Sequence, residues 1–498
     1  MRFEYQRVES LPRLAWCARL ARGASSMRVR HGPWVETRAD RFFEGAWDGD
    51  FADGRFDAAT AFTGSGCIAR ESEVVCVASM NACEWLFALR DGDELWISNS
   101  LVFALVEADD APDLSYPCYY GDILGVFRAG VTRPERAWVP TRRGRRLFLH
   151  PCVSLRVSAD LVITREPRRE PAPPDRYEDY LHRLEDTLAR VLSNAADERR
   201  SRRLRPVVAV SRGYDSPAVA VMASRAGVRE AVTFTDVKGT GEADSGREIA
   251  ERLGLRVTEY PHLAYRDLPG MPEAEASLCD WGWNAPYAAM EPQLTGALLL
   301  SGSHGDIVWR TSPVFPSLRH PTATTTGGGS MLELRLRAGY AHMAVPYVVS
   351  MDPRPLRRIS LSAEMRPWSI GGDYDRPIPR RIVEQAGIPR EGFGRSKSNA
   401  AHAPFRPLDA ARPSHRDLLR FVDALPRDRA REWKHRLLWR AYRADEWASL
   451  GAERALRALG ADVLLYPRVP ARWRKPTTVA SWAFHWGFEK IRDRYRVA

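Results

Sequence analysis

The chain has 498 residues, more than one hydrophobic core usually supports, so we expect two domains. Lys and Arg outnumber Asp and Glu by 74 to 63, which gives a formal net charge of +11. The acidic residues are interleaved with the basic ones, and the sequence contains no recognisable RNA-binding module. We therefore expect no nucleic-acid partner. Seven cysteines without paired spacing, and the lack of a signal peptide or a long apolar stretch, predict reduced thiols, no membrane span and a cytoplasmic location.

The first third of the chain is rich in short β-like runs. Four of them are Glu73–Met80, Glu94–Ser98, Arg146–Leu149 and Val153–Val157. Residues 166–175 are charged and proline-rich, which is typical of an extended, exposed linker. We therefore place a mostly β domain at residues 1–165 and a second domain at residues 176–498.

The second domain opens with a predicted amphipathic helix. Asp175 and Glu178 have the spacing of a capping box at a helix start. An apolar stripe follows at helical spacing and consists of Tyr177, Leu181, Leu184, Leu188 and Leu192. We expect this helix to pack beside a sheet.

The next apolar run, Val207–Val210, passes through a short polar loop into a helical segment, Pro217–Ala226. The loop reads Ser211-Arg212-Gly213-Tyr214-Asp215-Ser216. The first backbone amides of a helix lack internal partners and lie at the positive end of its dipole, so a loop at this position can hold an anion. Asp215 could bring Mg²⁺ to that anion. A polar surface turn is the alternative interpretation of the loop taken alone.

The residues after this helix predict a parallel sheet. They alternate as a strand, a helix and a strand at Ala231–Thr235, Glu242–Leu253 and Leu255–Tyr260. A further apolar strand, Ala297–Leu300, ends in a second loop that reads Ser301-Gly302-Ser303-His304-Gly305-Asp306. Loops at the carboxyl ends of parallel strands open into the same crevice, so we expect the two loops to face each other.

Two segments near the second loop could contribute to a substrate pocket. One combines aromatic walls with polar anchors, although an ordinary core turn has the same composition. Its residues are Asp280, Trp281, Trp283 and Asn284. The other, residues 322–330, is rich in Thr and Gly and could form a lid over the site or a surface insertion. After residue 360 the pattern is mostly helical, and the amphipathic segment Trp482–Tyr495 is more typical of core packing than of a membrane or partner contact.

The first loop resembles the pyrophosphate-binding loop of the ATP pyrophosphatase, or PP-loop, superfamily. That loop usually reads Ser-Gly-Gly-x-Asp-Ser, and this chain has Arg212 in place of the first Gly. The second loop is similar to one in asparagine synthetases, with Asp306 at the position of an Asp that helps to place the metal. The chain has Ile307 where those enzymes have Glu, which is more similar to the β-lactam-forming branch.

Two later motifs extend the resemblance. Val345-Pro346-Tyr347 with Asp352 is similar to the Val-Pro-Phe-Leu-Asp segment that closes the family's site, and Arg395-Ser396-Lys397 is similar to an Arg-x-Lys that contacts the ATP phosphates. Lys397 is also one of five lysines in a chain whose cations are mostly Arg, which favours a specific role for it. Residues 175–410 therefore resemble the asparagine synthetase-like ATP-dependent ligases, a group that includes β-lactam synthetases and lasso-peptide cyclases.

The resemblance implies an α/β fold in which a PP-loop synthetase domain with a helical C-terminal part follows a mostly β domain. Such enzymes use ATP and Mg²⁺ to adenylate a carboxylate, release pyrophosphate and let an amine or ammonia attack. The residues implied in ATP and pyrophosphate binding are Ser211, Arg212, Gly213, Tyr214, Asp215, Ser216, Thr235, Ser301, Gly302 and Gly305. The implied metal ligands are Asp215 and Asp306, and Lys397 would stabilise the developing negative charge. Ser303 and His304 join the aromatic segment as implied pocket residues.

The base that accepts the amine's proton is a separate question. The family commonly has a Glu three residues before the Val-Pro segment, and this chain has His342 there. An imidazole that titrates near neutral pH could serve as the base. A hydrogen-bonded structural histidine is equally consistent with the sequence, and His304 competes for the same role.

Asparagine synthetases also carry an N-terminal glutaminase domain of the N-terminal-nucleophile (Ntn) type, whose nucleophile is the Cys exposed after Met removal. This chain begins Met1-Arg2-Phe3, and Cys17 is too far along to supply an N-terminal amine. The resemblance therefore implies that residues 1–165 form a degenerate, inactive glutaminase-like domain, which would serve as a scaffold or as a wall of the substrate site.

The leading hypothesis is an amide-forming ligase of specialised, natural-product metabolism, acting on a small-molecule or peptide carboxylate and on an amine or ammonia. Two alternatives stay open: a catalytically degenerate relative that serves as a scaffold or binding subunit, and a tRNA-modifying PP-loop enzyme. The sequence also leaves open whether the chain forms a homo-oligomer or works with a partner enzyme.

Overall fold

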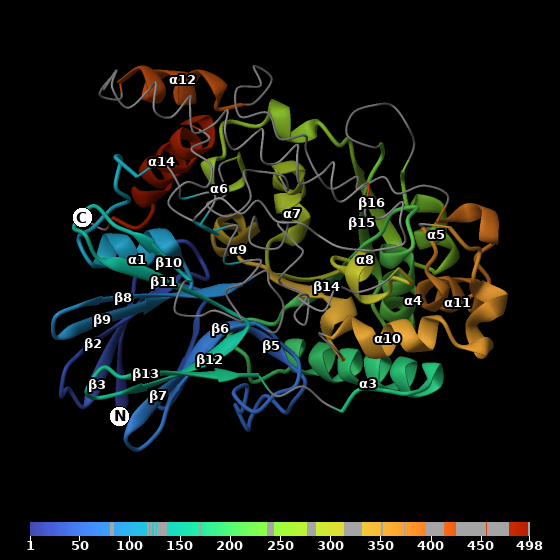
Figure 1. The fold of residues 1–498 in the computed structure, drawn as a ribbon, viewed down its shortest axis with the longest axis horizontal. Helices are drawn as coiled ribbons and strands as arrows, with labels where there is room; N and C mark the ends of the chain where they lie inside the picture. Colours follow the sequence, from blue (N-terminus) through green and yellow to red (C-terminus); the bar gives the residue numbers. More distant parts are fainter. Residues whose placement is uncertain are drawn as a thin grey trace.

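The fold is known from a computed structural model, which describes most of the chain. The described residues are 1–79, 84–116, 119, 122–123, 126, 137–168, 172–236, 244–275, 285–312, 331–349, 352–372, 374–394, 413–424, 455 and 478–496. Within them lie two β-sheets formed by the N-terminal third and one parallel sheet formed by the remainder (Figure 1). The structure is thus mixed α/β with a mostly β N-terminal region, as the sequence predicts.

The N-terminal region is a sandwich of two sheets. The first sheet has the order β1-β3-β2-β9-β8-β11-β10. Its strands are β1 (Arg2–Arg7), β2 (Trp16–Ala21), β3 (Ser26–His31), β8 (Trp85–Asp91), β9 (Glu94–Ser98), β10 (Trp138–Pro140) and β11 (Arg146–Pro151). The second sheet has the order β13-β12-β7-β6-β5-β4. Its strands are β4 (Glu36–Arg38), β5 (Arg41–Trp47), β6 (Phe62–Ala69), β7 (Glu73–Val77), β12 (Val153–Ser158) and β13 (Ile163–Pro167).

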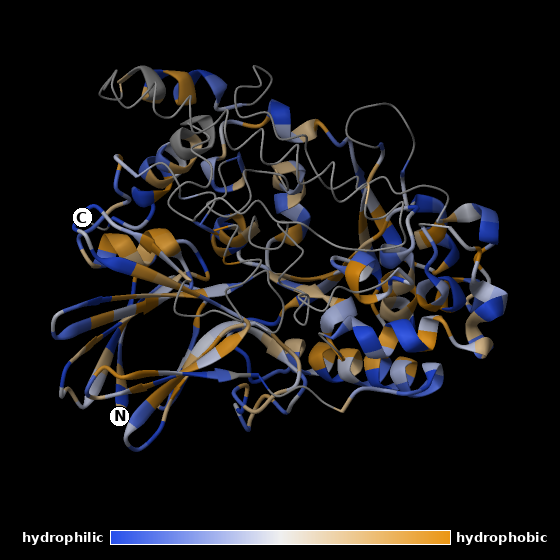
Figure 2. Cartoon of the chain, in the orientation of Figure 1, coloured by the Kyte–Doolittle hydropathy of each residue, from blue (hydrophilic) through white to orange (hydrophobic). Residues whose placement is uncertain are grey.

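The two sheets share one hydrophobic core. Alternate residues of each strand point into it, for example Leu86 and Ala88 from β8 and Val74 and Cys76 from β7, all of them buried. The outer face of the first sheet packs against α1 and against α14 near the end of the chain. Phe103 of α1 stacks on Tyr495, which follows α14, with ring centroids 4.8 Å apart. Figure 2 shows hydrophobic residues along α1 and hydrophilic ones at the outer hairpin turns.

The C-terminal two thirds contain a five-stranded parallel sheet. Its strands are β14 (Arg205–Ala209), β15 (Glu230–Phe234), β16 (Arg256–Tyr260), β17 (Ala297–Ser301) and β18 (Ala341–Ala344). The order is β16-β15-β14-β17-β18, so the chain builds outward from β14 on one side and then on the other. This reversal is the topological switch point of a doubly wound sheet, the place where such folds bind ligands at the carboxyl ends of the strands.

Helices cover the parallel sheet and link it to the sandwich. The α-helices are α1 (Leu101–Glu107), α3 (Tyr177–Ala195), α4 (Asp215–Arg225), α5 (Arg247–Arg252), α6 (Pro272–Glu275), α7 (Glu291–Leu294), α8 (Gly305–Val308), α9 (Leu332–Ala338), α10 (Pro353–Ser360), α11 (Pro377–Gln385), α12 (His415–Ala424) and α14 (Thr478–Arg492). The 3₁₀ segments are η2 (Ala264–Asp267), η3 (Ala285–Met290), η6 (Val345–Tyr347), η7 (Ala363–Trp368) and η8 (Arg390–Gly392). Helix α3 contacts both β5 and β14, so it spans the boundary between the two parts (Figure 1). None of the helices in the described part of the chain combines the length and apolar character that a bilayer crossing requires.

Several predicted elements occur close to their predicted bounds. Strand β9 covers Glu94–Ser98, and α1 follows it with Ser100 as its cap, whose hydroxyl accepts a hydrogen bond from the Phe103 amide at 3.1 Å. The stripe of α3 is buried at Tyr177, Leu184 and Leu188. Strand β13 continues to Pro167, inside the segment that the sequence suggests is a linker, because its backbone pairs with β12.

Two local predictions are wrong. The predicted capping box at Asp175 is not formed: Arg176 occupies the N-cap position of α3 and makes no side-chain cap. The predicted helix at Glu242–Leu253 starts only at Arg247, because Ser245 bridges to Ser211 and the Gly246 amide hydrogen-bonds to the Thr233 hydroxyl at 2.9 Å. These contacts engage Ser245 and Gly246 outside the helix, which a helix beginning before Arg247 would break.

Candidate nucleotide-binding site

The loop after β14 forms a compact turn that leads into α4. The hydroxyls of Ser211 and Ser216 lie 2.8 Å apart, and Ser216 also accepts the Ser211 amide at 3.0 Å. The Gly213 amide points to the Ser211 hydroxyl at 3.3 Å. Helix α4 has 11 residues, long enough for its dipole to favour an anion at this end. We refer to residues 211–216 as the cradle.

Gly213 lies where the cradle is open. A Cβ atom placed on it would lie 3.6 Å from the Ser211 hydroxyl and 3.6 Å from the Tyr374 hydroxyl, which is ordinary contact distance. The space beside Gly213 is therefore flanked by two hydroxyl groups and bounded by the first turn of α4. Hydroxyl groups and the first amides of a helix are groups that can donate hydrogen bonds to a phosphate.

The second predicted loop lies against the cradle, as the sequence predicts. A Cβ on Gly302 would lie 2.5 Å from the Ser216 amide nitrogen, and one on Gly305 would lie 2.5 Å from the Asp215 carboxyl carbon. Only glycine permits this approach of β17 to α4. Asp306 follows Gly305 and is half-buried, so the two predicted metal ligands come from adjoining segments.

Oxygen ligands from one or two carboxylates, completed by substrate phosphates, are the usual protein contribution to a Mg²⁺ site. Asp215 and Asp306 fit this description. The described residues contain no cluster of three or more His, Cys, Asp or Glu side chains that could bind a metal without such a substrate.

Arg212, which departs from the loop sequence described above, contacts residues outside the cradle. Its amide donates to Asp244 at 3.3 Å, its carbonyl accepts the Gly394 amide at 2.7 Å, and its side chain lies 3.6 Å from Glu248. Its φ angle is not in the positive range, so a side chain is tolerated where the family has glycine. Thr235 lies at the end of β15 and hydrogen-bonds to Asp236 at 3.0 Å.

The loop of β17 contains two further predicted residues. Ser303 accepts a hydrogen bond from the Ser301 hydroxyl at 2.9 Å. His304 adopts a left-handed backbone with φ of 66°, and its ring lies 4.8 Å from the ring of Tyr347 in η6. Asp352, the last residue of the predicted Val-Pro motif, caps α10 by accepting the Arg354 amide at 2.9 Å.

Of the two alternatives for His342, the structure favours the hydrogen-bonded structural histidine over the base. His342 lies in β18, where it is 4 % exposed and its Nε2 is 2.7 Å from the Ser301 hydroxyl. Burial, helped by the positive electrostatic influence of His304 and Arg335, lowers the pKa of His342 to about 3. Its imidazole is neutral at physiological pH and a weak base, so its evident contribution is to orient Ser301.

Two residues of the site could not be identified from the sequence. Arg376 is 5 % exposed, donates to the Gly305 carbonyl at 3.3 Å, and its Nε is 4.0 Å from Asp215. Tyr374 packs its ring 4.8 Å from that of Tyr214. Both come from the segment before α11, about 160 residues after the cradle. No local sequence pattern predicts that these two side chains contact the cradle. An Arg-rich chain offers many equivalent candidates.

Tyr214 has a structural role in the cradle. Its side chain is fully buried and its hydroxyl accepts a hydrogen bond from Arg380 of α11.

Some of the predicted site residues lie outside the part of the chain that the structure describes. These are Asp280, Trp281, Trp283, Asn284, Lys397 and residues 322–330.

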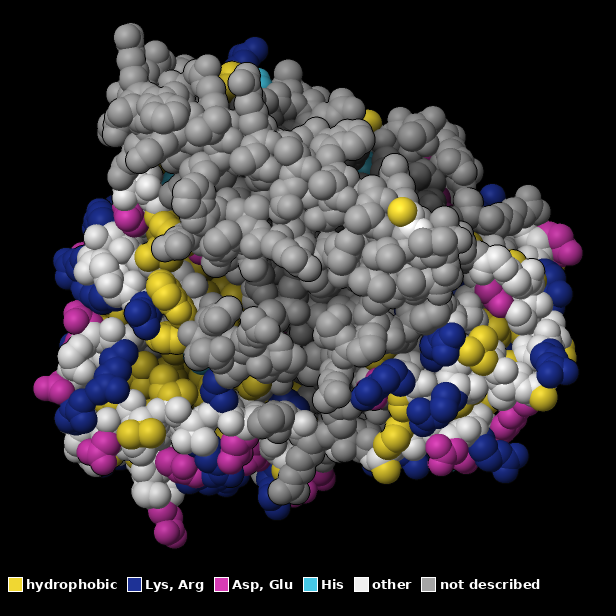
Figure 3. Space-filling model, viewed as in Figure 1, with side chains coloured by type: hydrophobic (Ala, Val, Ile, Leu, Met, Phe, Trp, Pro, Cys, Tyr) yellow, Lys and Arg dark blue, Asp and Glu magenta, His cyan; other side chains and the backbone are white. Residues whose placement is uncertain are grey.

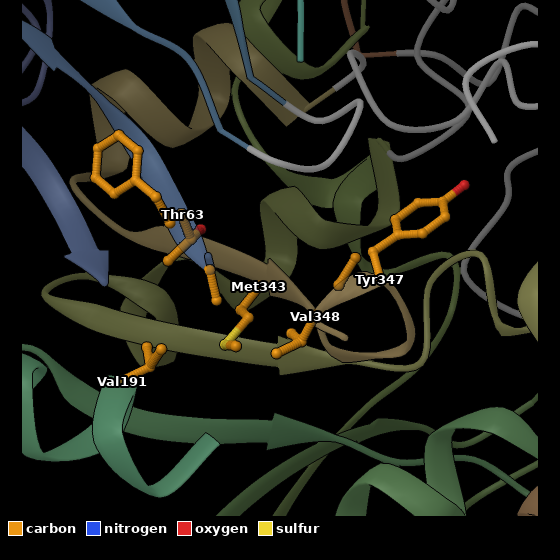
Figure 4. Close-up of a pocket in the computed structure, with 8 residues that line it drawn as sticks. Thr63, Val191, Met343, Tyr347 and Val348 are labelled. Carbon is orange, nitrogen blue, oxygen red and sulfur yellow. The ribbon is translucent and has the colours of Figure 1, made fainter. Parts of the chain in front are cut away.

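A small apolar cavity lies beside the site, at the boundary between the sandwich and the parallel sheet. Its volume is about 20 Å³, enough for roughly one water molecule. Its lining includes Thr63 from β6, Val191 from α3 and Met343 from β18, which are labelled in Figure 4. It is too small for a carboxylate substrate, so it does not replace the cradle as the candidate site.

Comparison of the sequence with models of known protein families gives no match, and comparison with curated proteins gives none either.

Proposed function

We propose that this protein is an ATP-dependent ligase that adenylates a carboxylate, releases pyrophosphate and forms an amide with an amine or ammonia. The observation that carries the proposal is the junction of the two glycine-containing loops at the switch point of the parallel sheet. Gly302 and Gly305 lie in close contact with Ser216 and Asp215, so the N-terminus of α4 lies against the loop that contains Asp306. An anion-binding helix end beside acidic residues is suited to a magnesium polyphosphate.

In this scheme the substrate carboxylate oxygen attacks the α-phosphorus of ATP, and the bond from that phosphorus to the bridging oxygen breaks. The charge that moves onto pyrophosphate would be met by the α4 N-terminus, by the Ser211 and Ser216 hydroxyls and by the guanidinium of Arg376. The amine nitrogen then bonds to the acyl carbon, AMP leaves and the amine loses a proton. Bound Mg²⁺, held by Asp215 and Asp306, would supply charge neutralisation at the phosphates.

The proposed architecture is a PP-loop synthetase domain preceded by an inactive glutaminase-like domain. The two-sheet sandwich flanked by α1 and α14 supports the second part of this proposal. We propose the substrates to be a small-molecule or peptide carboxylate and an amine, in specialised metabolism. Figure 3 shows basic and acidic side chains interspersed over the described part of one face, which favours a small-molecule substrate over a nucleic acid.

The test is release of pyrophosphate and AMP from ATP and Mg²⁺ in the presence of pooled carboxylates and amines. We expect the wild-type protein to release both, and Asp215→Asn to lose turnover by at least about a hundredfold, because the metal loses a charged ligand. Asp93→Asn is a matched control, since Asp93 is an exposed acid at the β8–β9 turn that pairs with Arg22. Unchanged turnover in Asp215→Asn would refute the metal assignment.

A wild-type protein that neither binds ATP nor releases pyrophosphate across the pool would refute the ligase. Co-purified RNA would instead favour nucleic-acid chemistry at the same cradle.

A further inference from the structure

The residues before α11 lie beside the cradle, and we refer to residues 369–372 and 374–376 as the strap. Asp375 accepts hydrogen bonds from the Ile370 amide at 3.1 Å and from the Ser369 hydroxyl, which closes the strap on itself. Gly371 and Gly372 have φ angles of 71° and 79°, a left-handed backbone that glycine adopts without strain. The next described residue, Tyr374, is directed from this strap to the cradle.

The Tyr374 hydroxyl is at the open side of the cradle. It lies 3.6 Å from the position of a Cβ on Gly213 and hydrogen-bonds to the backbone of Tyr214. The ring is fixed by its packing against the ring of Tyr214. Burial, with the nearby Asp215 carboxylate as a second cause, raises the pKa of Tyr374, so the phenol keeps its proton throughout the physiological range.

A hydroxyl group can accept one hydrogen bond while donating another. The Tyr374 hydroxyl lies beside Tyr214, the N-cap residue of α4, and its proton is available to a ligand in the space beside Gly213.

A second observation points to an anion in this space. Arg376, two residues along the same strap, is almost completely buried, and its Nε has no hydrogen-bond partner among the residues that the structure describes. Its Nε lies 4.0 Å from the Asp215 carboxylate. A buried guanidinium with an unused donor at this end of α4 is satisfied by an anionic ligand.

We propose that Tyr374 is a phosphate-binding residue, whose hydroxyl donates a hydrogen bond to the pyrophosphate portion of the nucleotide and thereby selects polyphosphates over ligands that lack them. This inference rests on the proposed function, because it requires the cradle to bind the phosphates of ATP. It adds a donor that belongs to the strap and not to the loop at residues 211–216.

The test is the binding of magnesium pyrophosphate, measured by titration calorimetry, to the wild-type protein and to Tyr374→Phe. We expect about a tenfold loss of affinity in the variant, since a hydrogen bond to a charged group is removed while the ring is kept. Adenosine, which lacks phosphates, should bind both proteins equally. Tyr177→Phe is the matched control, because Tyr177 is another buried phenol, in α3, and its hydroxyl makes no hydrogen bond among the described residues.

The outcomes separate the two proposals. If the wild-type protein binds pyrophosphate and Tyr374→Phe binds it equally well or more tightly, the role of Tyr374 is refuted and the ligase proposal stands. If the wild-type protein does not bind pyrophosphate, the proposed function fails and the role of Tyr374 fails with it. Tyr374→Gln, which keeps a donor at shorter reach, provides a second variant, and it should bind more tightly than Tyr374→Ala.

Discussion

Replacing Arg335 with methionine would remove the cation from a cluster of buried carboxylates between the sandwich and the parallel sheet. Arg335 lies in α9 and is 1 % exposed in its side chain. It binds Glu44 of β5 through two hydrogen bonds, of 2.6 and 2.9 Å, and its Nε is 3.5 Å from Glu84. Both glutamate side chains are fully buried.

The expected cost follows from this burial. Removing one partner of a buried ion pair costs about 3–5 kcal/mol, because the remaining charge is left without compensation. Arg335→Met leaves Glu44 and Glu84 without their cation, so we expect a loss of unfolding free energy within this range. In the double variant Glu44→Gln/Arg335→Met one of these charges is also removed, and we expect at least about 1 kcal/mol of the loss to be recovered.

Urea unfolding at pH 7.5, followed by tryptophan fluorescence, measures both quantities, with Glu44→Gln completing the cycle. The reasoning would be refuted by an Arg335→Met variant that loses less than about 1 kcal/mol. A double variant whose loss equals or exceeds the sum of the two single losses would refute it as well, because the groups would then not be coupled.

Three other predictions concern the same junction and the cradle. Burial raises the pKa of Glu84 to about 7, so protonation of this group stabilises the fold fully below the unfolded pKa near 4.5, and that contribution is lost as the pH rises through 7. The stability of Glu84→Gln relative to wild type should therefore increase by up to about 3 kcal/mol between about pH 5 and 8.5. Melting temperatures of the two proteins that change in parallel across this range would contradict this prediction. Gly302→Ala places a Cβ 2.5 Å from the Ser216 amide nitrogen and should cost about 1–3 kcal/mol, which a thermal melt identical to wild type would exclude. Gly213→Ala meets only ordinary contacts at 3.6 Å, so it should melt like wild type yet bind magnesium pyrophosphate at least about tenfold more weakly; unchanged binding would show that the space beside Gly213 is not the phosphate position.

Local features of the candidate site could be predicted from the sequence. The apolar run at Val207–Val210, the polar loop and the helix after it are properties of neighbouring residues, and the structure contains them as β14, the cradle and α4. The same holds for the loop after β17. That the two loops meet follows from a general rule of parallel sheets, and the contacts of Gly302 and Gly305 confirm it.

Other features depend on contacts between residues that are distant in the chain. Arg376 and Tyr374 reach the cradle, and Arg335 reaches Glu44 across 291 positions, only because the whole chain has folded. The acid–base character of His342 likewise depends on burial: the same imidazole titrates near neutral pH in water but has a pKa of about 3 inside β18. The sequence by itself determined most of the strands and helices and the two loops that follow β14 and β17, because periodicity and turn chemistry are local. The tertiary structure decided which distant side chains complete the site and what charge each carries, because packing and desolvation act between segments that the sequence does not place together.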